Sequence, residues 1–186
     1  MGSFEYITAL LSIIIGLGIT HLFVGVSRLI NNTTGVRIYW IHLLWTFYIF
    51  IYMISFWWFE YKYSTLHDLT FSIYLFMIFY AVLLFFLAVI NMPQHFPEDF
   101  KTYFFSSRKW FFIAVISTNV IDIFDSILKG RENLSGLGPD YVIFMSVTFI
   151  LLIMGMISKK VLVQAIVVIF MNLSQLWFLL SNFRTL

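Results

Sequence analysis

The sequence predicts an all-α, polytopic integral membrane protein, a helical bundle of about six transmembrane helices. Composition gives the first indication, since 61% of the residues are hydrophobic, 21% are aromatic and only 11% are charged. The second is that each apolar run approaches or exceeds the roughly 20 helical residues that cross the hydrocarbon core of a bilayer. The third is that the runs are continuous, whereas the strands of a membrane barrel are about ten residues long and alternate. The six expected spans are residues 4–30, 38–59, 69–92, 110–128, 141–158 and 161–183.

Turn-forming and polar residues separate the first three spans. The first span is followed by Asn-Asn-Thr-Thr-Gly at 31–35, a turn sequence. It lacks the basic start and the short apolar run of a signal peptide, so we expect it to be retained. The second span ends in three aromatic residues at 57–59, and the polar piece 60–68 leads into the third span. Tryptophan and tyrosine side chains, Trp45 among them, are expected mostly in the two interfacial belts of the membrane.

The second half of the chain contains the longest connector and a tight hairpin. Connector 93–109 has two prolines and an acidic pair at 98–99, which interrupt a continuous helix. Its mixed aromatic and basic residues suit a loop lying in the headgroup layer. The loop 130–139 is rich in glycine, and only Lys159 and Lys160 separate the last two spans. No connector is long enough for a soluble domain, so we expect one transmembrane domain covering 1–186.

The distribution of basic residues predicts the orientation of the bundle. Seven lie around the first, third and fifth connectors: Arg28, Arg37, Lys101, Arg108, Lys109, Lys159 and Lys160. Four lie on the opposite side: Lys62, Lys129, Arg131 and Arg184. Because basic residues are enriched in cytoplasmic loops, these three connectors are expected in the cytoplasm and both termini outside. The expected location is the bacterial cytoplasmic (inner) membrane.

A faint internal similarity suggests a 3+3 inverted repeat. His21 and Arg28 are seven residues apart, as are Asp122 and Lys129, and the two pairs are offset by 101 residues. A duplicated three-span unit places its copies in opposite directions across the membrane, an arrangement found in many transporters. Chance similarity between apolar sequences remains the alternative.

The fourth span carries the clearest polar face. Thr118, Asp122, Asp125 and Lys129 are spaced so that they share one side of a helix, and Asn119 widens it. An ionisable residue deep in a bilayer costs at least about 2.5 kcal/mol, so each requires a partner or a wet cavity. In one interpretation Asp125 pairs with Lys129 while Asp122 joins an interhelical hydrogen-bond network. In the other, Asp122 and Asp125 line a path for protons or cations.

Histidines inside the spans allow two further interpretations. His21 is either a neutral side chain bonded to a neighbouring helix or a proton relay working with Asp122. Haem ligation by His21 or His42 is not expected, because the two residues lie at different depths. No metal site is expected either, because Asp122 and Asp125 have no histidine nearby in the sequence. We therefore expect no cofactor.

Amide and small side chains predict helix packing. Asn172 and Gln175 share a face of the sixth span, either as a seam between helices or as the polar wall of a path. Ser12, Gly16 and Thr20 form a small-xxx-small stripe on the first span, which favours close helix approach. A homo-oligomer in contact with membrane lipid is the expected assembly.

Two main function classes remain. The first is a small transporter or channel moving protons, cations or a small solute beside the fourth span. The second is a membrane anchor, sensor or effector subunit that binds a soluble or membrane protein through connector 93–109. An intramembrane or lipid-modifying enzyme with Asp122 and His21 as acid and base is a weaker third, since no catalytic motif is present. Nucleic acid is not an expected partner at a net charge of +2. The residues expected to contact a protein partner are Phe100, Tyr103, Arg108 and Lys109.

Overall fold

The computed structural model describes residues 3–31, 35–65, 70–129 and 139–182, and nearly all of these residues are helical. Five of the described helices are long and apolar enough to cross a membrane, and the apolar part of α6, Tyr141–Ile157, is shorter. The described part of the chain therefore supports five to six crossings of an integral membrane protein. A 3-10 helix, η1 (Glu60–Thr65), directly follows α2. The helices are α1 (Ser3–Ile30), α2 (Trp40–Phe59), α3 (Phe71–Asn91), α4 (Phe100–Leu128), α6 (Pro139–Ile157) and α7 (Val161–Asn182).

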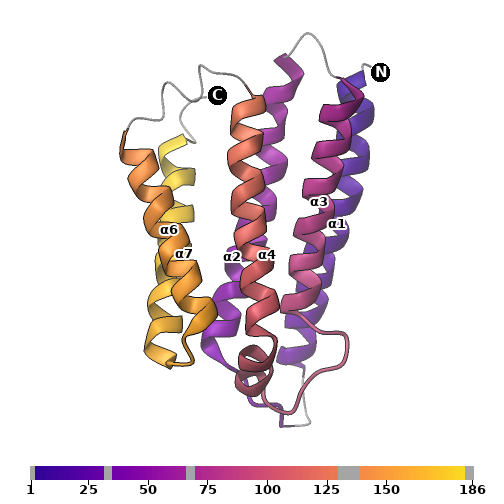
Figure 1. Cartoon of the computed structure of the whole chain (residues 1–186). Coiled ribbons are helices and arrows are strands. Elements are labelled where there is room, and N and C mark those ends of the chain that lie inside the picture. The colour runs from indigo at the N-terminus through magenta and orange to yellow at the C-terminus, as the bar shows by residue number, and fades with distance from the viewer. Residues whose placement is uncertain (1–2, 32–34, 66–69, 130–138, 183–186) are drawn as a thin grey trace.

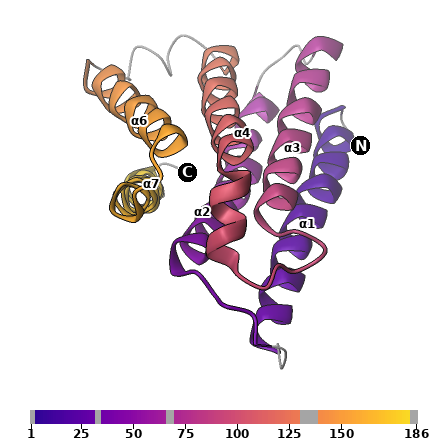
Figure 2. The ribbon, with the colours of Figure 1, turned by 60° about the horizontal axis from the view of Figure 1, so that its bottom comes forward.

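The helices lie side by side with their axes roughly aligned, and the chain direction alternates from one helix to the next (Figure 1). We call the end at which α1 begins and α7 ends the upper end; η1 and the last turn of α4 lie there as well. The α1–α2 and α3–α4 connections and the α6–α7 hairpin lie at the lower end. Successive helices pack against one another in the order α1, α3, α4, α6, α7, α2, and α2 also contacts α1, α3 and α4. Seen after rotation, α6 and α7 form a pair separated from α1 and α3 by α2 and α4 (Figure 2).

The second helix, α2, is the centre of the bundle. It packs against α1, α3, α4 and α7. The apolar stretch of α2 that could cross the membrane is 56% buried, whereas the corresponding stretches of the other four long helices are 28–39% buried. Trp45 is fully buried at 0% exposure, and the ring centroids of Phe111 and Phe112 lie 5.0 and 5.5 Å from its own. The expectation that Trp45 marks an interfacial belt is therefore wrong. The other four expected belt tryptophans lie on the outside of the bundle, with side chains 43–71% exposed: Trp40, Trp57, Trp58 and Trp110.

Helix α4 begins at Phe100, ten residues before the expected start at 110. Asp99 caps it, because its carboxylate accepts hydrogen bonds from the hydroxyl and amide of Thr102 and from the amide of Lys101. These hydrogen bonds, with that of the Thr102 hydroxyl the strongest, lower the pKa of the Asp99 carboxyl. A capping acid was thus the signal that the first ten residues of α4 are helix rather than interfacial loop.

Close helix approach on α1 does not use the expected stripe. A Cβ added at Gly16 meets nothing within 4 Å, and Thr20 is exposed. A Cβ added at Gly18 overlaps Met53, and one at Gly25 lies 3.0 Å from Met92. The contact face of α1 is therefore the one that carries Gly18 and Gly25, because it turns toward α2 and α3.

Two features bear on the remaining expectations about the whole bundle. The extensive α1–α3 contact has no counterpart of comparable extent between α4 and α7 among the described residues, so the inverted repeat stays a prediction.

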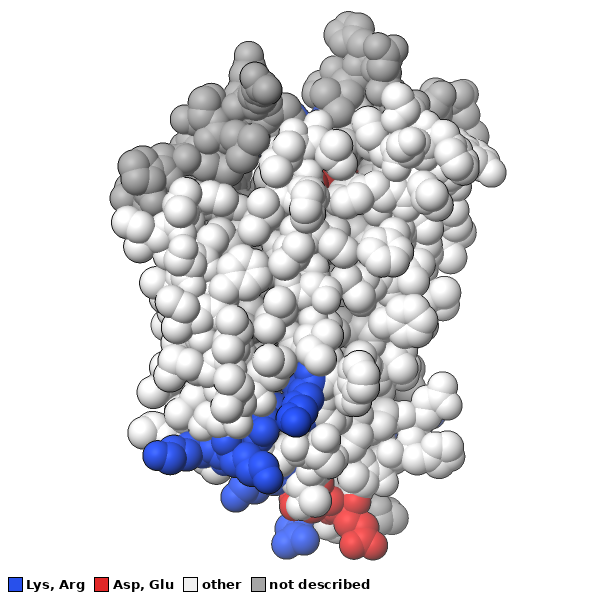
Figure 3. Space-filling view, in the orientation of Figure 1, with Lys and Arg blue, Asp and Glu red and all other residues white. Residues whose placement is uncertain are grey.

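On the face shown in Figure 3, charged side chains gather at the lower end, and the middle of the face is uncharged. Six of the seven basic residues predicted for this end have exposed side chains: Arg28, Arg37, Lys101, Lys109, Lys159 and Lys160.

Candidate functional site

A cluster of buried charges joins η1 to the last turns of α4 at the upper end. The ammonium group of Lys129 donates to Glu60 Oε1 at 2.9 Å and also pairs with the Asp125 carboxylate. The three side chains are only 5–7% exposed. The Asp125–Lys129 pair expected from the i,i+4 spacing is confirmed. Glu60 is an additional member that the sequence did not indicate.

Tyr63 completes this upper charge cluster, which we define as Glu60, Tyr63, Asp125 and Lys129. Its hydroxyl donates to Asp125 Oδ1 at 2.8 Å, and its ring centre lies 5.1 Å from the Lys129 ammonium. Side chains at i and i+3 of a 3-10 helix lie above one another, so η1 directs both Glu60 and Tyr63 toward α4. The cluster holds two carboxylates and one ammonium, and each charge depends on its partners because burial removes water from all of them.

A chain of hydroxyl groups lies next to this cluster, between α2, α3 and α4. The Tyr80 hydroxyl donates to Asp122 Oδ1 at 3.0 Å, and the hydroxyls of Tyr80 and Tyr52 are 2.7 Å apart. The Tyr52 hydroxyl also lies 3.5 Å from the backbone carbonyl of Thr118. Both tyrosines are buried, at 1% and 7% exposure. We call Asp122, Tyr80 and Tyr52 the hydroxyl chain.

Two further polar residues of α4, Thr118 and Asn119, donate hydrogen bonds within their own helix. The Thr118 hydroxyl and the Asn119 amide both donate to the carbonyl of Val115, at 2.7 and 2.8 Å. Both side chains are buried. They belong to the expected polar face, but these hydrogen bonds run along α4 and do not reach Asp122.

Below the hydroxyl chain the interior is closed by packed rings. The Tyr48 ring stacks on that of Tyr52 with 5.6 Å between centroids, and Trp45 lies 5.5 Å below Tyr48. Phe111 and Phe112 pack against Trp45, and both are at most 2% exposed. We call Trp45, Phe111 and Phe112 the aromatic layer.

A second, smaller set of polar groups lies between α2 and α3, nearer their lower ends than the hydroxyl chain. The Asn91 amide donates to Thr46 Oγ1 at 2.7 Å, and the Thr46 hydroxyl donates to the carbonyl of His42 at 3.0 Å. The His42 ring is 2% exposed and packs against Phe100 and Tyr103, with centroids 4.8 and 6.1 Å away. Along α2, His42 precedes Trp45 and Thr46 directly follows it, so these groups lie at the level of the aromatic layer and below it.

His21 and Asp122 do not form the proton-relay pair, which was one of the two interpretations that the sequence left open. The Nε2 atom of His21 is 2.6 Å from the carbonyl oxygen of Met92, at the lower end of α3. Asp122 lies near the upper end of α4, and α1 is not among the helices that pack extensively on α4. The alternative that His21 bonds a neighbouring helix as a side chain is the one the geometry supports.

The amides of α7 hold helices together. The Asn172 amide donates to the carbonyl of Leu44 at 3.2 Å, and the Gln175 amide donates to Ser55 Oγ at 3.0 Å. Both bonds join α7 to α2, so these residues form the seam rather than a part of the hydroxyl chain. Ser12 plays a similar part elsewhere, since its hydroxyl accepts from the indole N–H of Trp57 at 2.9 Å.

The surface expected to bind a protein partner is largely interior. Phe100 is 1% exposed and Arg108 is 3% exposed. The Tyr103 hydroxyl donates to the carbonyl of Ile90 at 2.7 Å, and Arg108 Nε donates to that of Met156 at 3.0 Å. Of the four expected contact residues, Lys109 alone has an exposed side chain, because the segment is the start of a packed helix.

In the described ranges, no group of three or more His, Asp or Glu side chains is arranged to hold a metal ion. No protein-family model, curated protein sequence or solved structure matches this chain. The functional interpretation therefore depends on the geometry of the buried polar groups alone.

Four residues of the site were not identified from the sequence: Glu60, Tyr63, Tyr52 and Tyr80. Tyr52 and Tyr80 occur inside apolar runs rather than at their ends. A hydroxyl at that depth requires a hydrogen-bond partner, and this is the signal that distinguishes them from tyrosines of an interfacial belt.

Glu60 also lies beside a cavity. Its Oε2 atom is buried and has no hydrogen-bond partner in the described part of the chain. The cavity has a volume of about 250 Å³ and lies between α1 and the end of α2. Its lining is mostly apolar, from Phe4, Thr8, Leu11, Trp57, Trp58, Glu60 and Tyr61. One carboxylate of the upper charge cluster thus adjoins the space between helices.

Proposed function

We propose that the protein is a membrane transporter or channel that moves protons along the buried polar groups between α2, α3 and α4. The observation that carries this proposal is the hydroxyl chain, a continuous run of hydrogen bonds from Asp122 through Tyr80 to Tyr52 inside the bundle. A hydroxyl both donates and accepts, so a proton taken up at one end of such a chain is released at the other.

Protons fit this geometry better than metal cations or larger solutes. The tyrosines of the hydroxyl chain are buried, and no residue of the hydroxyl chain lines either the cavity beside Glu60 or the cavity beside His21. A hydrated ion requires open space, whereas a proton moves along hydrogen bonds without it. Buried ionisable residues in membrane helices are typical of proton relays.

The two ends of the path have different roles in this proposal. At the upper end, Glu60 offers an unpaired oxygen next to a cavity, which supports proton entry from that side. Toward the lower end, the aromatic layer closes the interior beneath Tyr48. Apolar constrictions of this kind gate pores, so conduction requires the aromatic layer to open transiently.

The test is proton flux into liposomes that contain the purified protein and a pH-sensitive dye, driven by a potassium diffusion potential. Asp122→Asn removes the acid and keeps its shape, and Tyr80→Phe removes only the hydroxyl that links Asp122 to Tyr52. Tyr6→Phe is the matched control, because Tyr6 is 68% exposed and lines neither cavity. A hydrogen bond to a charged group is worth about 1.5 kcal/mol, so we expect both core variants to reduce flux by about tenfold.

Equal flux in the wild type and both core variants would show that the hydroxyl chain does not conduct. Unchanged tryptophan fluorescence in each variant is the check that a loss of flux is not a loss of fold. Liposomes prepared without protein give the background flux, and only flux above that background is assigned to the protein.

We also propose that the lower end faces the cytoplasm of a bacterial inner membrane, which the seven-against-four distribution of basic residues supports. The chain has no cysteine, so single cysteines report the side directly. Ser64→Cys at the upper end should react with a membrane-impermeant maleimide in intact cells, and Lys160→Cys at the lower end should not. The reverse pattern would invert the orientation.

A further inference from the structure

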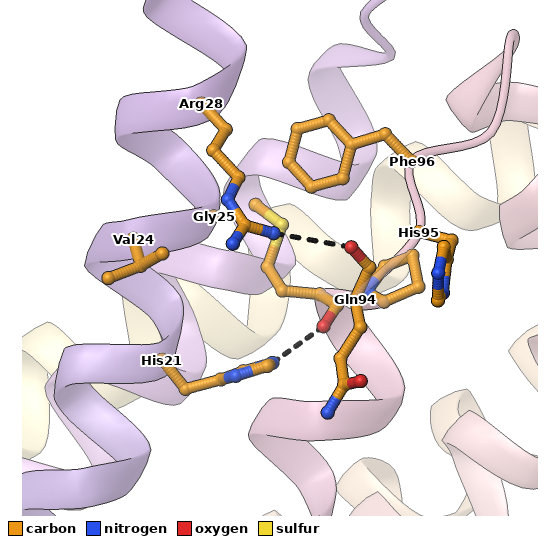
Figure 4. A pocket seen from close by; sticks show the side chains of 9 residues that line it. His21, Val24, Gly25, Arg28, Gln94, His95 and Phe96 are labelled. Atoms are coloured by element: carbon orange, nitrogen blue, oxygen red, sulfur yellow. Dashed lines mark hydrogen bonds between the residues drawn. The ribbon is translucent and has the colours of Figure 1, made fainter.

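A polar cavity of about 360 Å³ lies at the lower end, far from the hydroxyl chain. One wall is the last part of α1, and the other is the segment that leaves α3 (Figure 4). The lining residues are His21, Val24, Gly25, Arg28, Met92, Pro93, Gln94, His95 and Phe96. Neither the proposed proton path nor the upper charge cluster uses any of them.

The cavity is lined by nitrogen-bearing side chains and contains no acid. Arg28, His21 and His95 contribute a guanidinium and two imidazoles, and none of the nine lining residues is Asp or Glu. Arg28 Nη1 donates to the carbonyl of Gln94 at 3.2 Å, which is one of its five donors. A guanidinium in this setting attracts anions, because no lining carboxylate neutralises it.

Two backbone contacts fix the shape of the cavity. His21 and Arg28 bond two carbonyls of the segment, those of Met92 and Gln94, and hold it against α1 (Figure 4). Gly25 lies between these two anchors, and a Cβ there would come within 3.0 Å of Met92. The missing side chain lets the segment approach α1 while the space around Arg28 remains open.

The position of the cavity matches that of lipid phosphates. Arg28 is in the last turn of α1, a helix long and apolar enough to span the membrane, so it lies at the boundary of the hydrocarbon core. Headgroup phosphates lie in the layer just beyond that boundary, and basic residues there attract anionic lipids. The volume is within the usual range for small-molecule sites, about 300 to 1,000 Å³.

We infer that this cavity binds a phosphate-bearing anion through Arg28, with His95 as a second contact. Two sources share this chemistry: the headgroup of an anionic phospholipid and a soluble phosphate ester. In both cases the planar guanidinium donates two parallel hydrogen bonds to phosphate oxygens, which Lys cannot reproduce. This inference does not depend on the proposed proton path.

The test compares ligands and variants by native mass spectrometry of the detergent-solubilised protein. The lipid probes are phosphatidylglycerol and phosphatidylcholine with the same acyl chains, and the soluble probe is glycerol 3-phosphate. Arg28→Gln removes the guanidinium, whereas Lys109→Gln removes an exposed charge from the same end outside the cavity and serves as the matched control. We expect Arg28→Gln to weaken phosphatidylglycerol binding by about tenfold and Lys109→Gln to leave it unchanged.

The outcomes separate the two sources and the failure of the inference. Preference for phosphatidylglycerol that depends on Arg28 identifies a lipid headgroup as the ligand. Binding of glycerol 3-phosphate that depends on Arg28, without a preference between the lipids, identifies a soluble phosphate ester. Equal losses in Arg28→Gln and Lys109→Gln, or no phosphate binding by the wild type, would overturn the inference. His95→Asn, outside the helices, gives the same comparison if Arg28→Gln does not fold, with a weaker loss expected.

Discussion

The strongest prediction concerns Lys129, the single cation of the upper charge cluster. Lys129→Met leaves the Glu60 and Asp125 carboxylates buried without the ammonium that both of them contact. At 2.9 Å, the attraction between Lys129 and Glu60 is about 6 kcal/mol at an effective dielectric constant of about 20. The cost of desolvation opposes this attraction, and removing one member of a buried pair typically destabilises a protein by about 3 to 5 kcal/mol.

The assay is equilibrium unfolding in mixed micelles with increasing sodium dodecyl sulfate, followed by tryptophan fluorescence. The chain has six tryptophans, and fully buried Trp45 reports on the core. We expect the free energy of unfolding of Lys129→Met to fall by about 3 to 5 kcal/mol. Lys109→Met, at an exposed lysine of the lower end, should change it by no more than about 0.5 kcal/mol.

A triple variant tests the physical cause. Combining Lys129→Met with Glu60→Gln and Asp125→Asn removes every charge of the cluster and keeps the polar partners of Tyr63. It should recover at least about half of the lost stability, because no uncompensated charge remains. Wild-type stability in Lys129→Met, or a triple variant less stable than the single one, would falsify the assignment of a buried, mutually dependent charge cluster.

Three further predictions follow from the packing of α4 and α6. Gly155→Ala should lower the free energy of unfolding by about 1 to 3 kcal/mol, because its Cβ would lie 2.5 Å from the fully buried ring of Phe112, whereas Gly16→Ala should not destabilise. Arg108→Gln should cost about 1.5 to 3 kcal/mol and speed amide hydrogen exchange in the last turn of α6, whose carbonyl groups the guanidinium caps; unchanged exchange would contradict this role. Asp99→Ala should lower the unfolding midpoint at pH 7. Because the pKa of Asp99 is lowered in the fold, this difference should persist above about pH 4 and shrink as the pH falls through the lowered value; a difference that grows with acid would refute the capping role.

In the buried site, residue spacing along a helix predicts contacts within that helix but not contacts between helices. The i,i+4 spacing correctly paired Asp125 with Lys129, because both residues are on one helix and share a face. The third member, Glu60, is 69 residues away from Lys129 in the chain, and no spacing rule connects them. The same limit applies to Tyr80 and Asp122, which are 42 residues apart.

The same limit left two interpretations of His21 open. Depth along the helix indicated a buried imidazole, but the residue opposite it depends on which helix packs against α1. That helix is α3, and the partner is the Met92 carbonyl rather than Asp122. The small-residue stripe is not a close-packing face for a similar reason: Ser12 bonds Trp57 of α2, but a Cβ added at Gly16 meets no atom within 4 Å.

The sequence by itself determined the class of the protein. Long continuous apolar runs with few charges have one stable arrangement in lipid, helices whose backbone groups bond internally, and the turn residues between the runs set their order. Only the tertiary structure decided that α2 occupies the centre and that charges from η1 and α4 meet. The physical reason is that lipid chains are as apolar as leucine, so hydrophobicity places helices in the membrane without selecting their neighbours. Close packing at glycines and a few interhelical hydrogen bonds make that selection, and both depend on side chains far apart in the chain.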